Sequence, residues 1–353
     1  MPLPRRQLLT LAGAGGLALL ARGLGGEPGH ARPGRPVAAL AAVPRGSQRL
    51  GLISDLNASY GSTTYVPQVH RGVQLLRELQ VDLVLCAGDM IAGQKAGLSA
   101  DRLDEMWSSF ERQVLQPLRT GGAPFAPAMG NHDASGSRGP QGYLFALDRE
   151  RAARFWRRRR EGLGLQIVAG EGFPFRYSIR QGEIFTVVLD ASTAQVSEAD
   201  WTWAEAQLSS PAARRARLRL LMGHLPAYGI SEGRDRPGEV LQRPGRLQQL
   251  IERQGVHLYI SGHQHAWYPA RVQGMNLLGL GAMGSGPRPL VSGNRPPVQT
   301  LTLLDLFPER NLLVETTVDL NRLQPIALSS LPATLQPRSG PVLQRRSTRT
   351  ELR

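Results

Sequence analysis

The stretch Gly130-Asn131-His132-Asp133 directly follows a short apolar run, residues 124–129, that is typical of a buried strand. Three polar side chains in succession at the end of such a strand are a poor choice for packing. They suit chemistry, because an Asn oxygen can bind a metal ion and a His can transfer a proton near neutral pH. Taken alone, the stretch is equally compatible with a polar loop built on an Asx turn. The rest of the chain decides between these interpretations.

Around this stretch, short apolar runs alternate with segments whose apolar residues recur at helical spacing. The sequence predicts strands over residues 50–54, 82–87, 124–129, 175–179, 184–189, 218–222 and 256–260, helices over 66–80, 100–119, 198–208 and 244–254, and an antiparallel block over 268–281 and 298–319. Residues 134–172 are less regular, and the basic run 157–160 indicates an exposed helix end. Strands that alternate with helices imply a largely parallel sheet covered by helices.

Polar side chains follow five of the predicted strands. They are Asp55, Asp89, Asn131, His224 and the pair His263 and His265. In open α/β sheets, ligands bind in the crevice beyond the carboxyl ends of the strands, so the fold would bring these side chains together. A single Gly-Asp or Gly-His is common in ordinary turns. Five such clusters at strand ends indicate a metal site.

Composition narrows the class of protein. The 353 residues are 41% hydrophobic and 20% charged, as expected of a globular protein with one large domain or two. The formal charge is +14, but residues 1–41 and 325–353 each contribute +4, so a dedicated nucleic-acid partner is not expected. Cys86 is the only cysteine and lies in an apolar run, which excludes an intramolecular disulfide and a Cys-based zinc site.

The two ends of the chain are predicted to lie outside the folded domain. Arg5-Arg6 precede an apolar run, residues 8–21, that is too short to span a bilayer and resembles a twin-arginine export signal. We expect a signal over residues 1–41, export to the periplasm or the extracellular space by that route, and no stable membrane span after processing. The alternative is an uncleaved membrane anchor. The expected domain covers residues 42–324, and the Pro- and Arg-rich tail, 325–353, is expected to be disordered.

The motif order resembles the calcineurin-like metallophosphoesterase superfamily, which includes purple acid phosphatases and several phosphodiesterases. The motifs are Asp55, Gly88-Asp89, Gly130-Asn131-His132-Asp133, Gly223-His224 and Gly262-His263-Gln264-His265, and the resemblance covers about residues 48–320. It implies an α/β fold with four layers, an α/β/β/α sandwich whose two central mixed sheets are flanked by helices. It also implies two divalent or trivalent metal ions in the crevice, namely Mn, Fe or Zn.

The resemblance also implies a role for each site residue. Asp89 would bridge both metals. Asp55 and His265 would complete the first site, and Asn131, His224 and His263 would complete the second site. His132 would protonate the leaving oxygen of the substrate, and Asp133 would orient the His132 ring.

This chain departs from the family pattern at two positions. Asn57 replaces the His of the first family motif, so it is either a metal ligand through its oxygen or a turn residue. Ala92 stands where purple acid phosphatases carry a tyrosine ligand. The stretch that begins at Tyr60 could line the pocket or form a Gly-Ser turn that leads into a helix.

The sequence therefore predicts a metal-dependent hydrolase of phosphoric esters that uses a dinuclear site and a metal-bound hydroxide. A phosphatase acting on a small phosphorylated monoester is the first choice, and a phosphodiesterase of the same fold is the alternative. Because Asn57 replaces His, a weakly catalytic or non-catalytic phosphate-binding relative is the second alternative. The presence of His132 and Asp133 argues against it, since a binding protein needs no general acid.

Overall fold

The computed structural model describes Leu40 and residues 42–352, which belong to one compact unit, Arg35–Arg353. Apart from Leu40, the predicted export signal over residues 1–41 lies outside the described residues. Within the described part of the chain, no helix has the length and hydropathy that crossing a membrane requires.

Seven strands form the first sheet, in the order β15-β14-β13-β1-β2-β3, with β18 also paired to β14. Their bounds are β1 Gln48–Ile53, β2 Leu83–Cys86, β3 Phe125–Pro127, β13 Thr300–Phe307, β14 Leu312–Asp319, β15 Gln324–Pro325 and β18 Arg349–Glu351. Strands β1, β2 and β3 are parallel, and β13 pairs antiparallel with β1. The first three strands therefore end at the same edge of the sheet.

Nine strands form the second sheet, in the order β16-β17-β11-β12-β10-β9-β8-β7-β6. Their bounds are β6 Ile167–Ala169, β7 Tyr177–Gln181, β8 Ile184–Val188, β9 Leu218–Met222, β10 Leu258–Ser261, β11 Tyr268–Val272, β12 Met275–Gly279, β16 Thr334–Leu335 and β17 Leu343–Arg345. The central strands β8, β9, β10 and β12 are parallel, and the outer pairings are antiparallel. Both sheets are therefore mixed.

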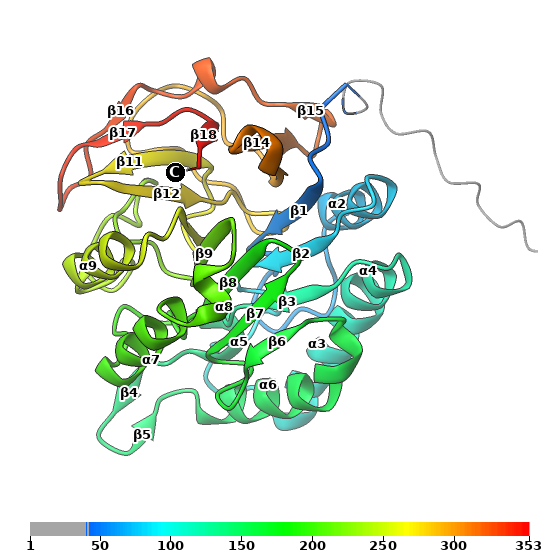
Figure 1. Ribbon diagram of the computed structural model, residues 1–353. Coiled ribbons are helices and arrows are strands. Elements are labelled where there is room, and N and C mark those ends of the chain that lie inside the picture. Colours follow the sequence, from blue (N-terminus) through cyan, green and yellow to red (C-terminus); the bar gives the residue numbers. More distant parts are fainter. Residues whose placement is uncertain (1–39, 41, 353) are drawn as a thin grey trace, which may run out of the picture. The chain divides into compact units, whose positions relative to one another are not determined.

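Helices lie on both flanks of the two sheets, so the predicted fold class is confirmed. They are α2 Pro67–Glu78, α3 Ala100–Phe110, α4 Gln116–Thr120, α5 Asn131–Ala134, α6 Ala146–Arg159, α7 Glu198–Leu208, α8 Pro211–Arg214 and α9 Pro244–Gln254. In Figure 1, α2 and α4 lie on one flank and α7 and α9 on the other, with strands of both sheets between them. A small hairpin of β4 Arg138–Gly139 and β5 Gly142–Tyr143 joins α5 to α6. A π-helical turn, Glu111–Leu115, divides the helix predicted over residues 100–119.

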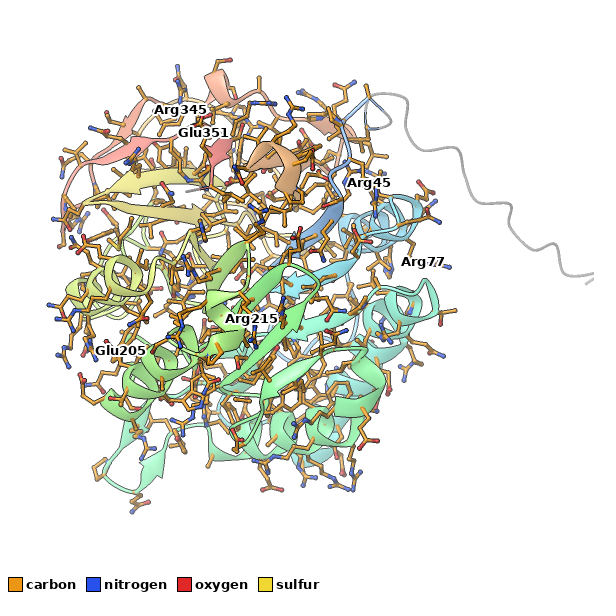
Figure 2. The ribbon with its side chains drawn as sticks, viewed as in Figure 1. Arg45, Arg77, Glu205, Arg215, Arg345 and Glu351 are labelled. Carbon is orange, nitrogen blue, oxygen red and sulfur yellow. The ribbon has the colours of Figure 1, made fainter. Side chains whose placement is uncertain are left out.

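Arginine side chains are spread over the molecule. Figure 2 labels Arg45, Arg77, Arg215 and Arg345 on separate parts of it. Arg45 forms an ion pair with Asp82 at 2.9 Å on the partly exposed surface. The predicted exposed basic run, residues 157–160, lies at the end of α6 and is mostly exposed.

Helix α6 is longer than the irregular pattern of residues 134–172 suggests. Its buried face mixes Phe155 and Trp156 with Asp148 and Arg149. Arg149 forms an ion pair with Asp190 at 2.7 Å and donates to a backbone carbonyl. Because charged residues share the buried face, the apolar residues alone do not show a helical period.

The expectation that the tail, residues 325–353, is disordered is wrong. Strand β17 pairs with β11, and β18 pairs with β14. Leu335 and Leu343 are buried, and Arg346 forms an ion pair with Glu315 at 2.6 Å. Composition suggested disorder because Pro, Ser and Arg dominate the segment, but its few leucines contribute to the core.

Candidate metal centre

The predicted ligands converge because they follow strands of both sheets at their carboxyl ends. Asp55 follows β1, Asp89 follows β2, Asn131 follows β3, His224 follows β9, and His263 and His265 follow β10. The first three belong to the seven-stranded sheet and the others to the nine-stranded sheet. The site therefore lies where the carboxyl edges of the two sheets meet.

The backbone is strained at four of these positions. The φ angles are 53° at Asp55, 56° at Asp89, 67° at His263 and 54° at His265. Residues other than glycine rarely adopt this left-handed region, and such residues cluster at functional sites. The fold therefore holds these four side chains in place at a conformational cost.

Two motif glycines allow the loops to pack closely. A Cβ atom on Gly130 would overlap the Asp89 carboxylate, and one on Gly262 would overlap the Ser54 hydroxyl. Both residues have ordinary negative φ angles, so close approach explains the glycines at these positions. The Gly-Asn-His-Asp and Gly-His-x-His motifs need their glycines for this reason.

The second site is the more densely assembled of the two. Nε2 of His224 lies 2.9 Å from Oδ1 of Asn131 and 3.2 Å from Oδ2 of Asp89. Nδ1 of His263 lies 3.0 Å from the same Asn131 oxygen. Ligand atoms of Asp89, His224 and His263 all lie within 4.8 Å of one another, and these three residues are buried.

Hydrogen bonds on the side away from the site orient two of the predicted second-site ligands, His224 and Asn131. His224 donates from Nδ1 to the Ala87 carbonyl at 2.7 Å, and Asn131 donates from Nδ2 to Gln94 at 2.5 Å. When His224 is neutral, its Nε2 lone pair and the Asn131 oxygen therefore face each other with no proton between them. Converging acceptor atoms of this kind suit a cation, so these residues fit a metal ion.

The first site has fewer donor atoms. Nε2 of His265 lies 3.3 Å from Oδ1 of Asp55, and His265 donates from Nδ1 to the Gly286 carbonyl at 2.9 Å. The Asn57 oxygen Oδ1 accepts a hydrogen bond from the Ser285 hydroxyl at 2.5 Å. Between described residues, no hydrogen bond joins the Asn57 side chain to Asp55 or His265. Of the two interpretations of Asn57, this geometry favours the turn residue.

The pKa values of the buried side chains also fit a metal ion at the second site. Burial alone would lower the pKa of His224, but the Asp89 carboxylate raises this pKa to about 9. Burial alone would raise the pKa of Asp89, but His224 and His132 hold it well below its usual range. Burial lowers the pKa of His263 to about 4. The cluster thus favours one positive charge beside Asp89, and a bound metal ion would supply that charge in place of a proton.

The role predicted for Asp133 is wrong. Its carboxylate accepts hydrogen bonds from four backbone N–H groups at 2.7–3.0 Å, those of Asp89, Met90, Ile91 and Gly130. It ties the Asp89 loop to the Asn131 loop and does not orient the His132 ring. The His132 ring is oriented by the Gly93 carbonyl, which accepts from Nδ1 at 3.1 Å. Aspartate occupies this position because its two oxygens can accept all four donors.

A cavity of about 210 Å³ opens beside the second site. His132, Tyr60, Arg234 and Glu239 are among its lining residues. Residue Tyr60 is 56% exposed, and its ring lies 5.1 Å from the His132 ring, centroid to centroid. Tyr60 therefore lines the pocket, as one of its two interpretations expected.

Sequence reasoning missed several residues that shape the centre. Gln94 and Glu239 lie in loops and contact the predicted ligands Asn131 and His263. The carbonyls of Ala87, Gly93 and Gly286 orient three of the histidine rings. A backbone carbonyl has no sequence signal, and the two loop side chains stand in no motif.

The comparisons with known proteins agree with this geometry. Residues 48–267 match the family described as calcineurin-like phosphoesterase. No curated protein matches the chain by sequence.

Three solved structures have a similar fold. A purple acid phosphatase from yellow lupin (Lupinus luteus) seeds has 16% identity over 79% of this chain and 52% of that chain, with a TM-score of 0.59. A dimetal phosphatase from Danio rerio has 14% identity over 80% of this chain and 98% of that chain, with a TM-score of 0.52. A protein described as PhoD has 11% identity over 77% of this chain and 66% of that chain, with a TM-score of 0.53. The chain thus spans about half the length of the lupin enzyme.

Proposed function

The chain belongs to the calcineurin-like phosphoesterase family, and from this premise we propose that it is a metal-dependent phosphomonoesterase acting on a small phosphorylated substrate. The observation that carries the proposal is the set of converging acceptor atoms on Asp89, Asn131, His224 and His263, next to a cavity lined by His132.

Two metal ions would be held by the residues that the family motifs assign. Asp55, His265 and Asp89 would hold the first ion, and Asn131, His224, His263 and Asp89 would hold the second. The metals, when bound, neutralise charge on the phosphoryl group and activate water for attack. Manganese, iron and zinc all suit this mixture of carboxylate, amide and imidazole ligands.

His132 is placed to handle the proton of the leaving group. Its Nδ1–H donates to the Gly93 carbonyl, so Nε2 is the nitrogen that is free to carry and release a second proton. The Asp89 carboxylate lies 3.9 Å from Nε2. A proton given from Nε2 to the leaving oxygen would produce the alcohol directly.

The cavity supports a monoester over a diester. Its volume is about 210 Å³, and the Arg234 guanidinium lies in its wall. A terminal phosphate exposes more unesterified oxygens than a diester, and the Arg234 guanidinium, which also pairs with Glu239 at 3.2 Å, would donate to one of them. Tyr60 and His132 lie side by side in the wall of this cavity, where the leaving group would emerge.

The test compares p-nitrophenyl phosphate with bis(p-nitrophenyl) phosphate, each assayed with Mn²⁺, Fe²⁺ or Zn²⁺ added to the purified protein. The proposal expects faster turnover of the monoester and loss of turnover with a chelator. Faster turnover of the diester would replace the monoesterase by the phosphodiesterase of the same fold. The absence of turnover with every metal would favour the phosphate-binding relative.

The sequence of the N-terminal region supports export of this enzyme. Arg5-Arg6 and the apolar run 8–21 carry that part of the proposal. N-terminal sequencing of the protein from its native host should give a mature start near Ala42. Full-length protein in the cytoplasm would contradict export.

A further inference from the structure

A carboxylate outside the family motifs contacts one of the candidate ligands. Glu239 lies in the loop between β9 and α9, and its Oε2 lies 2.8 Å from Nε2 of His263. The His263 side chain is 5% exposed and that of Glu239 is 21% exposed. The contact is therefore largely shielded from water, and it lies on the side of the ring away from the other ligands.

The opposite ring nitrogen of His263 faces the second site. Its Nδ1 lies 3.0 Å from Oδ1 of Asn131 and 3.3 Å from Nε2 of His224. A neutral imidazole carries one proton, on one of its two nitrogens. The Arg234 guanidinium also lies beside the ring, 3.0 Å from Nε2 and 3.2 Å from Nδ1, but the Glu239 oxygen is the nearer partner of Nε2. With Glu239 accepting from Nε2–H, the proton is held there, and the lone pair of Nδ1 points at the site.

The loop holds Glu239 in this position through further contacts. Arg234 lies 3.2 Å from one carboxylate oxygen of Glu239, and Arg236 lies 3.4 Å from the other. Gln264, which stands between the two motif histidines, donates to the backbone carbonyls of Arg234 and Glu239. The loop and the ligand segment are thus fixed to each other, so Glu239 has little freedom to leave the His263 ring.

We propose that Glu239 is a positioning residue for the second metal site, acting through His263. This inference rests on the proposed function, because it requires a metal at that site. A carboxylate that accepts the outer N–H of a metal-binding histidine fixes the tautomer and makes the ring a stronger ligand. Loss of such a partner typically weakens metal binding by about 10–100-fold.

The experiment measures bound Mn²⁺ per full chain after dialysis against buffers that fix the free Mn²⁺ concentration. We expect Glu239→Gln, which keeps the size but removes the charge, to raise the free Mn²⁺ needed to fill the second site by about tenfold, and Glu239→Ala by up to about 100-fold. The filling of the first site should not move. Glu232→Gln is the matched control, because Glu232 is an exposed carboxylate in the same loop.

The outcomes separate this inference from the function on which it rests. Two filling steps in the unmodified chain that stay unchanged in Glu239→Gln would overturn the inference alone. An equal shift of both steps would also overturn it, because it would indicate a general change of structure. If the unmodified chain binds no Mn²⁺, both the inference and the proposed function are wrong. Thermal unfolding of each variant checks that the chain is folded.

Discussion

The two halves of the metal centre differ in how firmly the protein orients their donor atoms. In the second site, Asn131, His224 and His263 each donate a hydrogen bond at the far side, to Gln94, Ala87 and Glu239. In the first site, His265 donates to the Gly286 carbonyl, and the Asp55 carboxylate accepts from the backbone N–H of His263 at 3.0 Å. Asn57 stands where the family pattern has a histidine that would add a ligand to the first site, and its side-chain oxygen accepts a hydrogen bond from Ser285. A metal ion that binds to preoriented donors needs less free energy to order their side chains. We therefore expect the second site, with three such donors, to bind Mn²⁺ more tightly than the first.

Asp89→Asn should have the largest effect, because it removes the one charge that the two halves share. We expect loss of metal from both sites and a fall in kcat/KM of at least about 10²–10³-fold, as for the loss of a preorganised electrostatic group. Elemental analysis and p-nitrophenyl phosphate turnover measure the two effects. Asp305→Asn is the control, because Asp305 is a buried, ion-paired carboxylate on β13. Retention of both metals in Asp89→Asn would contradict the bridging role.

His132→Ala separates proton transfer from metal binding. His132 lies beside Asp89 but is not a predicted ligand, so both metals should remain. The loss should reach about 10²–10⁴-fold on alkyl phosphates. It should be small on p-nitrophenyl phosphate, whose leaving group is stable as an anion. Equal losses on both substrates would indicate that His132 positions the substrate and transfers no proton.

The comparison of the two halves is tested by removing one ligand from each. We expect His265→Asn to keep one tightly bound Mn²⁺ per chain and His224→Asn to keep only weak binding. Each loss should exceed the cost of removing an outer partner of a ligand, which is about 10–100-fold in metal affinity. Mn²⁺ binding at buffered free concentrations gives both values. Equal residual affinities in the two variants would show that the halves are alike.

Asn57→Ala should have the smallest effect on metal binding. The Ser285 hydroxyl contacts both the side-chain and the backbone oxygen of Asn57, so it keeps one acceptor after the substitution. The cost should therefore be at most about 0.5–1.5 kcal/mol of unfolding free energy, the typical net value of a hydrogen bond. The Mn²⁺ content and its midpoint should stay the same. Ser285→Ala is the matched variant, because it breaks the same hydrogen bond from the other side. A clear drop in first-site affinity in Asn57→Ala alone would make Asn57 a ligand.

Much of the fold could be predicted because short apolar runs mark the strands and apolar residues at helical spacing mark most of the helices. Helix α9 begins and ends where residues 244–254 predict it, and β9 coincides with residues 218–222. Only the basic end of helix α6 was predicted, because Asp148 and Arg149 share its buried face. The ordered tail was not predicted, because its partners β11 and β14 are distant in sequence. Both failures concern contacts that only tertiary structure supplies.

The convergence of the site could be predicted from strand ends, but the contacts within it could not. Asp133 follows His132 directly, which suggested that it orients the His132 ring. Its carboxylate instead accepts from the backbone of two loops, and the Gly93 carbonyl contacts the ring. Glu239 stands outside the motifs, in a loop whose position depends on Gln264. Hydrogen bonds to backbone and to loop side chains leave no spacing in the sequence.

The measurement that tests the central claim most directly follows bound Mn²⁺ per chain and p-nitrophenyl phosphate turnover over the same series of buffered free Mn²⁺ concentrations. The claim is that turnover needs two metal sites of unequal affinity. We expect two separate filling steps, with turnover rising along the second, weaker step. Full turnover in the presence of excess chelator, or at the end of the first step, would contradict it.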